Sequence, residues 1–260
     1  MSSTIRTIAS RTIAIGTAAV LGLASVAMAT TTTDQLEELN LRAWNGETEL
    51  LAEVYAPDAV HSATFYDLTR EYVGPDAIAA VARYGAIEPV APHIDIPAAE
   101  GELRWADFVS LAGGTACLWR AIDGLIVRQD CVLPESSDGN RAPAGLADAQ
   151  ASASIDEVME RLRVAWHPGT TVEELSEVYA ADAVHSARYL DRTRVYDGPQ
   201  GIRGIIRSGS PETLGRVDFE APEGELAWAS VSDIAGGTVC LFRAVDGMIT
   251  RHDCVLPIKG

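Results

Sequence analysis

The spacing of apolar residues predicts a short series of helices followed by strands, and this series occurs twice. Leu36, Leu39, Ala43 and Trp44 have helical spacing and predict a helix over 34–45. A second short helix is predicted over 47–55, a strand over 59–65, a short strand over 71–73 and a third helix after Gly74-Pro75. Alternating patterns then predict strands over 93–97, 102–111, 115–122 and 125–133.

The second half of the chain repeats this order. Residues 54–63 read VYAPDAVHSA, and residues 178–187 read VYAADAVHSA. Equivalent residues lie 122 to 124 positions apart, a period as long as a small domain and too long for a solenoid repeat. We therefore expect a tandem duplication, with a first domain over 30–134, a linker over 135–153 that is rich in small and polar residues, and a second domain over 154–260.

Four cysteines occur as two equivalent pairs, Cys117 with Cys131 and Cys240 with Cys254. An even number of cysteines in an exported protein indicates disulfides, and the duplication favours one bridge inside each copy. Asp123-Gly124 is a hairpin signal, and a three-residue loop there would place Cys117 opposite Cys131, within disulfide reach. A two-residue loop would shift this register by one.

The first 29 residues have the features of a secretory signal. Arg6 and Arg11 precede an uncharged run that ends in Ala27-Met28-Ala29, which favours cleavage after Ala29 over an uncleaved anchor. The formal charge is −17, and the loss of both arginines would make it −19. This acidity disfavours binding to nucleic acid or anionic membranes. We expect an exported protein that has no membrane attachment after cleavage.

The order of predicted elements, with Y-A-x-D-A-V-H before the first long strand, G-P-x-x-I at the third helix and a late D-G-x-I hairpin, resembles the SnoaL-like branch of the nuclear transport factor 2-like superfamily. The resemblance covers most of 34–134 and 155–257. It implies an α+β fold: two tandem cones, each a curved, mostly antiparallel sheet packed on about three helices around an apolar pocket. Relatives include cyclases, isomerases, dehydratases and non-catalytic binders, so the fold alone leaves the function open. In relatives the outer sheet face often dimerises, which implies that the two copies pair as an internal pseudo-dimer.

His61 and His185 are the first candidates for chemistry. The resemblance places their strand beside the pocket, where a neutral imidazole can act as a general base. The alternative is a hydrogen-bonded histidine without a catalytic role. Asp67 and Asp191 follow six residues later, either as acids that act with the histidines or as turn residues.

Two further groups of residues are candidates for binding. Aromatic side chains either line the pockets or belong to the core: Tyr55, Tyr72, Trp105 and Trp119, with Tyr179, Tyr196, Trp228 and Phe242. Trp44 and Trp166 are interpreted as core anchors. A charged cluster on the last two strands is either an anion site or a salt-bridged outer face: Arg120, Arg128 and Asp130, with Arg243, Arg251 and Asp253. His252 replaces Gln129, so the copies differ there.

Common metal and cofactor motifs are missing from the sequence: it has no C-x-x-C, H-E-x-x-H, Walker loop or dinucleotide glycine pattern. We expect no metal and no cofactor. The favoured function is the binding of a small apolar or carbonyl-containing molecule in the pockets. The alternatives are a cofactor-independent lyase, isomerase or cyclase that uses a His–carboxylate pair, and a non-catalytic interaction module.

Overall fold

A computed structural model describes residues 31–82, 87–140, 153–207 and 209–260. The predicted signal segment lies outside them. The elements of the first copy are α1 (Thr33–Trp44), a 3-10 turn η1 (Thr48–Leu50), α2 (Leu51–Val54), β1 (Tyr55–Thr64), β2 (Thr69–Val73), α3 (Pro75–Ala82), β3 (Ile94–Ile96), β4 (Glu102–Val109), η2 (Leu111–Gly113), β5 (Thr115–Ile122) and β6 (Leu125–Val132).

The second copy repeats this order. Its elements are α4 (Ile155–Ala165), α5 (Val172–Ser176), β7 (Tyr179–Arg188), β8 (Thr193–Asp197), α6 (Gly198–Arg203), β9 (Thr213–Phe219), β10 (Glu225–Ser232), η3 (Ile234–Gly236), β11 (Thr238–Val245) and β12 (Met248–Val255). Among the described residues, no helix is both long enough and apolar enough to span a lipid bilayer.

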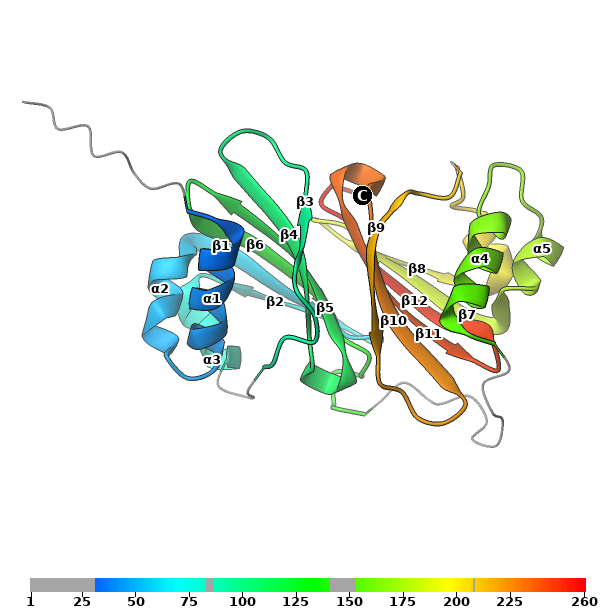
Figure 1. The fold of residues 1–260 in the computed structure, drawn as a ribbon, viewed down its shortest axis with the longest axis horizontal. Helices are drawn as coiled ribbons and strands as arrows, with labels where there is room; N and C mark the ends of the chain where they lie inside the picture. Colours follow the sequence, from blue (N-terminus) through cyan, green and yellow to red (C-terminus); the bar gives the residue numbers. More distant parts are fainter. Residues whose placement is uncertain (1–30, 83–86, 141–152, 208) are drawn as a thin grey trace, which may run out of the picture. The chain divides into compact units, whose positions relative to one another are not determined.

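Each copy forms one six-stranded sheet, with the order β2-β1-β6-β5-β4-β3 in the first and β8-β7-β12-β11-β10-β9 in the second. The pairs β1–β6 and β12–β7 are parallel, and all other neighbours are antiparallel. In the first copy α1, α2 and α3 lie together on one side of the sheet (Figure 1). The prediction of two tandem α+β domains with mostly antiparallel sheets is confirmed.

The first helix of each copy begins at a side-chain cap. Thr32 and Ser154 cap α1 and α4, and the side chains of Gln35 and Glu157 return the bond to the cap backbone, which completes a capping box at each helix. The first helix buries Leu36, Ala43 and Trp44 against the sheet. The helices thereby fix one wall of a cavity whose other wall is the sheet.

The disulfides join Cys117 to Cys131 and Cys240 to Cys254, as predicted. The strand register that places the cysteines opposite each other does not come from the three-residue loop that the sequence suggested. The loop has two residues, Asp123 and Gly124, both at positive φ (51° and 79°), which is a type I′ turn. A bulge after Arg120 then shifts the register by one, so that Cys117 faces Cys131.

The outer faces of the two sheets bury a shared apolar cluster. It contains equivalent residues from both copies, such as Leu118 with Leu241 and Val132 with Val255. Hydrogen bonds across the contact are reciprocal: Arg128 donates to the carbonyl oxygen of Leu190 (3.5 Å), and Arg251 donates to that of Tyr66 (3.1 Å). This reciprocity is that of a two-fold interface. The inner faces of both sheets therefore remain available to the pockets.

Candidate functional site

Each copy contains a cavity between its helices and the inner face of its sheet. The cavity has a volume of about 600 Å³ in the first copy and about 590 Å³ in the second. These volumes are within the range of small-molecule sites. The walls use equivalent positions, among them Trp44 and Trp166, His61 and His185, and Ala63 and Ala187. The two tryptophans interpreted as core anchors thus also line the cavities.

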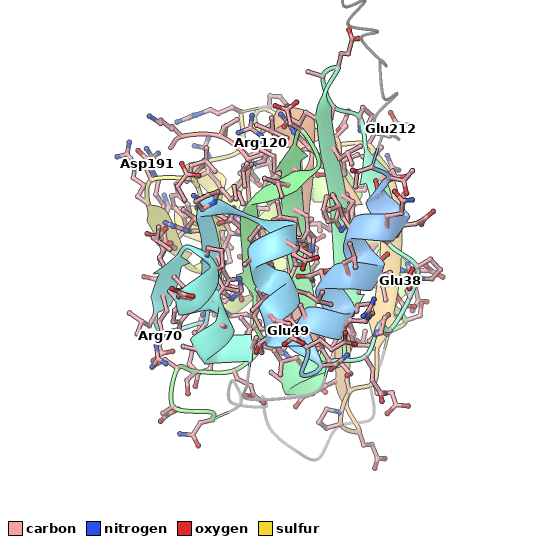
Figure 2. All side chains as sticks on the ribbon, turned by 90° about the vertical axis from the view of Figure 1, so that its left-hand side faces the viewer. Glu38, Glu49, Arg70, Arg120, Asp191 and Glu212 are labelled. Atoms are coloured by element: carbon pink, nitrogen blue, oxygen red, sulfur yellow. A yellow bond between two sulfur atoms is a disulfide. The ribbon has the colours of Figure 1, made fainter. Side chains whose placement is uncertain are left out.

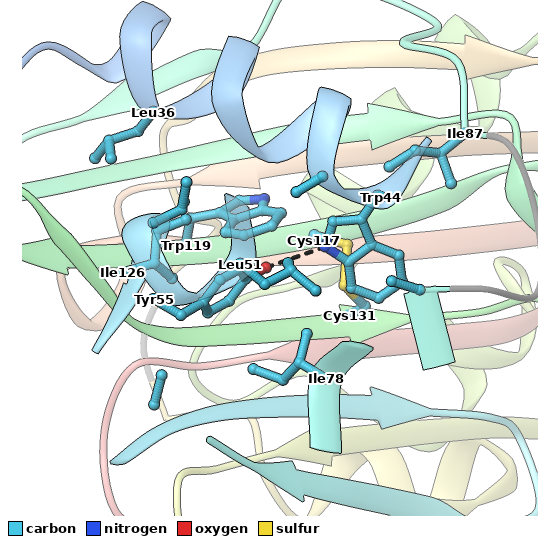
Figure 3. Close-up of a cluster of buried hydrophobic side chains, with 14 of the residues drawn as sticks. Leu36, Trp44, Leu51, Tyr55, Ile78, Ile87, Cys117, Trp119, Ile126 and Cys131 are labelled. Carbon is cyan, nitrogen blue, oxygen red and sulfur yellow. Dashed lines mark hydrogen bonds between the residues drawn. A yellow bond between two sulfur atoms is a disulfide. The ribbon is translucent and has the colours of Figure 1, made fainter. Parts of the chain in front are cut away.

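In the first copy a buried tyrosine connects the helix to the disulfide. The hydroxyl of Tyr55 accepts a bond from the Trp44 indole (3.2 Å), and it donates to Oε1 of Gln129 (2.7 Å). The amide nitrogen of Gln129 then donates to Sγ of Cys131 (3.4 Å). Figure 3 shows Trp44, Tyr55 and the disulfide of Cys117 side by side beneath α1. The amide of Gln129 thereby contacts both the phenol and the sulfur, and Oδ1 of Asn40 is a second acceptor 2.9 Å from the same hydroxyl.

In the second copy His252 takes the place of Gln129. Its Nδ1 lies 3.0 Å from the Tyr179 hydroxyl, and its Nε2 lies 3.1 Å from Sγ of Cys254. Because a disulfide sulfur has no hydrogen to donate, the proton belongs on Nε2, and Nδ1 accepts from the phenol. The imidazole therefore makes the same two hydrogen bonds as the amide. This local role accounts for the difference between the copies that stood out in the sequence.

His61 and His185 are both buried and both face a cavity. Burial lowers the pKa of each imidazole to about 4, so both are neutral near pH 7. Nδ1 of His185 donates to the carbonyl oxygen of His252 (2.8 Å). Nδ1 of His61 has no hydrogen-bond partner among the residues that the structure describes. The first-copy histidine therefore lacks the backbone hydrogen bond that orients His185 in the second copy.

Asp107 is a pocket residue that the sequence reasoning missed. It lies on β4 opposite Cys117, lines the same cavity as His61 and is 5% exposed. Burial raises the pKa of its carboxyl to about 7, and the nearby charge of Glu37 acts in the same direction. Its Oδ1 has no hydrogen-bond partner within the described ranges. The equivalent residue in the second copy is Ser230, opposite Cys240.

The structure does not bring Asp67 or Asp191 into a cavity. Asp67 is exposed and accepts bonds from the backbone nitrogen (2.7 Å) and hydroxyl (2.9 Å) of Ser137. Asp191 lies at the surface (Figure 2) and accepts from the backbone nitrogen of Gly260 (2.9 Å). These backbone bonds hold the pKa of both carboxyls below its usual value. Both residues take the turn position that was the alternative in the sequence.

The aromatic candidates divide into two groups. Tyr72, Trp119 and Phe242 line the cavities. The other five pack behind the cavity walls: Tyr55, Tyr179, Tyr196, Trp105 and Trp228. The indole of Trp105 stacks on Trp119 (5.5 Å between centroids), and that of Trp228 stacks on Phe242 (4.9 Å). Each stacked pair holds in place the ring that faces the cavity, which is Trp119 in the first copy and Phe242 in the second.

The charged cluster lies on the outer face of the sheets, and each arginine has a carboxylate of the chain beside it. Arg128 donates to Asp130 (2.6 and 2.8 Å), and Arg251 donates to Asp253 (2.7 Å). Arg120 donates to Glu102 (2.6 Å), and Arg243 lies 3.4 Å from Glu225. The carboxylates balance the opposed guanidinium groups without an external anion.

Two groups within the described residues could hold a metal ion. The first is Asp34, Glu37 and His93, partly exposed on the helix side of the first copy. In the second copy the position of His93 is taken by Arg216, whose guanidinium bonds Asp156 and Asp218. The second group is His185, His252 and Cys254, all buried in the cavity wall.

A scan against protein-family models and a search of curated proteins both gave no match. Solved structures do match, one copy at a time. A protein from Sphaerobacter thermophilus is 18% identical, with a TM-score of 0.30, and covers 39% of this chain and 94% of its own. An NTF-2 like protein of unknown function from Silicibacter pomeroyi is 14% identical, with a TM-score of 0.31 and coverages of 38% and 89%.

A protein from Catenulispora acidiphila with a ketosteroid isomerase-like fold, solved in complex with trimethylamine, is 14% identical. Its TM-score is 0.28, and it covers 38% of this chain and 85% of its own. At these identities the likeness concerns the fold alone. The chain is similar, one copy at a time, to proteins of the nuclear transport factor 2-like fold.

Proposed function

We propose that the protein is exported and binds a small apolar or carbonyl-containing molecule in its two cavities. The observation that carries this proposal is the pair of cavities of about 600 Å³, in which apolar atoms supply most of the exposed wall and polar side chains supply the rest. Burial of apolar ligand surface supplies affinity in such a site, and the few polar atoms orient the ligand. The two disulfides fit an oxidising compartment.

A fluorescent aryl ketone tests the binding. Prodan, an apolar naphthyl ketone, is expected to saturate at two equivalents per chain. Ala63→Phe and Ala187→Phe place a ring in the first and second cavity respectively, so each variant should lose one equivalent. Val73→Ser, at a side chain that is 62% exposed, is the matched control and should bind like the wild type. Unchanged saturation in both phenylalanine variants contradicts the proposal.

As the alternative, we propose acid–base catalysis on a carbonyl compound in the first-copy cavity. Asp107 has a pKa of about 7, which suits a group that both takes up and releases a proton near neutral pH. The pKa of His61 is too low for an efficient base, so its neutral ring is better suited to hydrogen bonding with the carbonyl group. Asp107 would remove a proton next to the carbonyl group and return it elsewhere, as a cofactor-independent isomerase or cyclase does.

Exchange of α-protons reports this activity without knowledge of the natural substrate. In D2O the protein should speed the loss of the α-proton NMR signals of bound prodan, more strongly as the pH rises through 7. Asp107→Asn keeps the size of the side chain and should abolish the acceleration. Ser230→Ala, at the equivalent position of the second copy, should leave it unchanged. Equal exchange rates in the wild type and Asp107→Asn exclude the catalytic role.

A further inference from the structure

We propose that reduction of the second-copy disulfide creates a binding site for a thiolate-preferring divalent cation such as Zn²⁺, with Cys240, Cys254, His185 and His252 as ligands. The site would lie in the cavity wall of the second copy only. It does not depend on which molecule the cavities bind.

Three neighbouring strands place the four side chains on one face of the sheet. His252 and Cys254 alternate along β12, Cys240 pairs with Cys254 across β11, and His185 pairs with His252 across β7. All four line the cavity. The available nitrogen and sulfur atoms of His185, His252 and Cys254 lie within 4.8 Å of one another, and Cys240 is bonded to Cys254.

This spacing fits a tetrahedral ion. Zn²⁺ bonds of about 2.0 Å to nitrogen and 2.3 Å to sulfur place neighbouring ligand atoms roughly 3.3 to 3.8 Å apart. Nε2 of His252 is 3.1 Å from Sγ of Cys254, so this pair needs little movement. The main change is the separation of the two sulfur atoms once their bond is broken.

The surrounding hydrogen bonds already orient the imidazoles. Nδ1 of His185 donates to the carbonyl oxygen of His252, which leaves Nε2 with a free lone pair on the cavity side. In the oxidised protein, Nε2 of His252 points its N–H at the sulfur of Cys254, and Nδ1 accepts a hydrogen bond from the Tyr179 hydroxyl. A phenol hydroxyl can both donate and accept hydrogen bonds. When Nε2 becomes a metal ligand, the imidazole proton moves to Nδ1, and the hydroxyl can accept a hydrogen bond from it.

The chemistry balances with a thiol or phosphine reductant. Two electrons and two protons convert the disulfide to two thiols. A thiol reductant supplies both and leaves as its own disulfide, whereas a phosphine supplies the electrons, takes an oxygen atom from water to become the phosphine oxide, and the two protons come from that water. Binding of the cation then releases the two thiol protons and forms two metal–thiolate bonds. Each histidine binds through the lone pair of a neutral imidazole and releases no proton.

The first copy is an internal comparison that lacks one ligand. Gln129 occupies the place of His252, with the same contacts to a tyrosine and to a disulfide sulfur. Its amide is a poor ligand for Zn²⁺ beside thiolates. Reduction of the first copy would leave Cys117, Cys131 and His61 as nitrogen and sulfur donors, with the carboxylate of Asp107 opposite Cys117. A carboxylate oxygen suits a thiolate-preferring ion less well than an imidazole, so we expect one tight site per chain.

Cobalt titration of the full chain tests the proposal. Co²⁺ substitutes for Zn²⁺ and gives thiolate-to-metal charge-transfer and tetrahedral d–d bands. The chain, reduced by a phosphine without oxygen, should bind about one Co²⁺ per chain with these bands, and Zn²⁺ should displace it. The oxidised chain should show no charge-transfer band.

Two variants give each copy the residue that the other copy has at position 129 or 252. His252→Gln gives the second copy the residues of the first and should weaken Co²⁺ binding by about 100-fold or more, beyond the 10–100-fold typical of a lost supporting residue. Gln129→His should add a second Co²⁺. The proposal is overturned if His252→Gln binds Co²⁺ like the wild type. It is also overturned if the reduced chain keeps its β-sheet circular dichroism yet shows no charge-transfer band. Loss of that circular dichroism on reduction overturns it as well, because the four ligands come together only in the folded chain.

Discussion

Replacing Asp107 by serine should stabilise the protein in a pH-dependent way. The folded carboxyl has a pKa of about 7, against 3.8 for an ordinary aspartate. Between these values the folded state holds a proton that the unfolded state has released, so stability falls as the pH rises. At about 1.4 kcal/mol for each pKa unit, the loss between pH 4 and pH 8 is about 4 kcal/mol. Serine cannot ionise, and the second copy already holds Ser230 at this position.

Guanidinium unfolding followed by tryptophan fluorescence measures the effect. Asp107→Ser and the wild type are compared at pH 4 and pH 8, and the variant should gain about 4 kcal/mol relative to the wild type over this interval. Asp182→Ser, at an exposed aspartate of β7, is the control and should show no such gain. If the stability of Asp107→Ser follows the wild type at every pH, the carboxyl is not held neutral by its surroundings.

Other changes test the interface, the pocket and the predicted leader. Glu71→Val should cost about 2 kcal/mol because it removes the carboxylate that bonds the buried Arg188, and the double variant with Arg188→Thr should recover most of this in denaturant unfolding. His252→Gln should stay within about 1 kcal/mol of the wild type, whereas His252→Ala should cost about 3 kcal/mol by leaving the Tyr179 hydroxyl unpaired beside a new cavity. Mass spectrometry of the exported protein should find Thr30 as its first residue.

The duplicated elements and the disulfides could be predicted because each depends on local patterns. Helical spacing and the Asp-Gly hairpin turns act over a few residues, and the repeat supplied each signal twice. The bulge that sets the cysteine register could not be predicted, since it depends on how the strand twists against its neighbours. Cys117 was correctly placed opposite Cys131, although the prediction assumed a three-residue loop and the structure has a two-residue loop with a bulge.

Asp107 shows what a comparison of the two copies can reveal. It is the only acidic residue within the strand sequence Trp105-Ala-Asp-Phe-Val109, where the second copy has Trp228-Ala-Ser-Val-Ser232. An aspartate in the middle of a buried strand is rare without a partner, and this was the available signal. His61 and His185 were predicted as site residues because both copies contain them. Asp107, which distinguishes the two cavities, lies at a position where the copies differ.

The outer and inner faces of each sheet are under different constraints, and the geometry explains why. On the outer face, Leu118 and Leu241 pack in one cluster, and Arg128 and Arg251 make reciprocal bonds, so a change in one copy must suit a surface of the other. On the inner face, the side chains line the cavity of their own copy. Substitutions there are independent in each copy, provided that the local hydrogen bonds are kept, as His252 keeps those of Gln129. Duplication therefore fixes the pairing of the domains and leaves two cavities whose chemistry can separate.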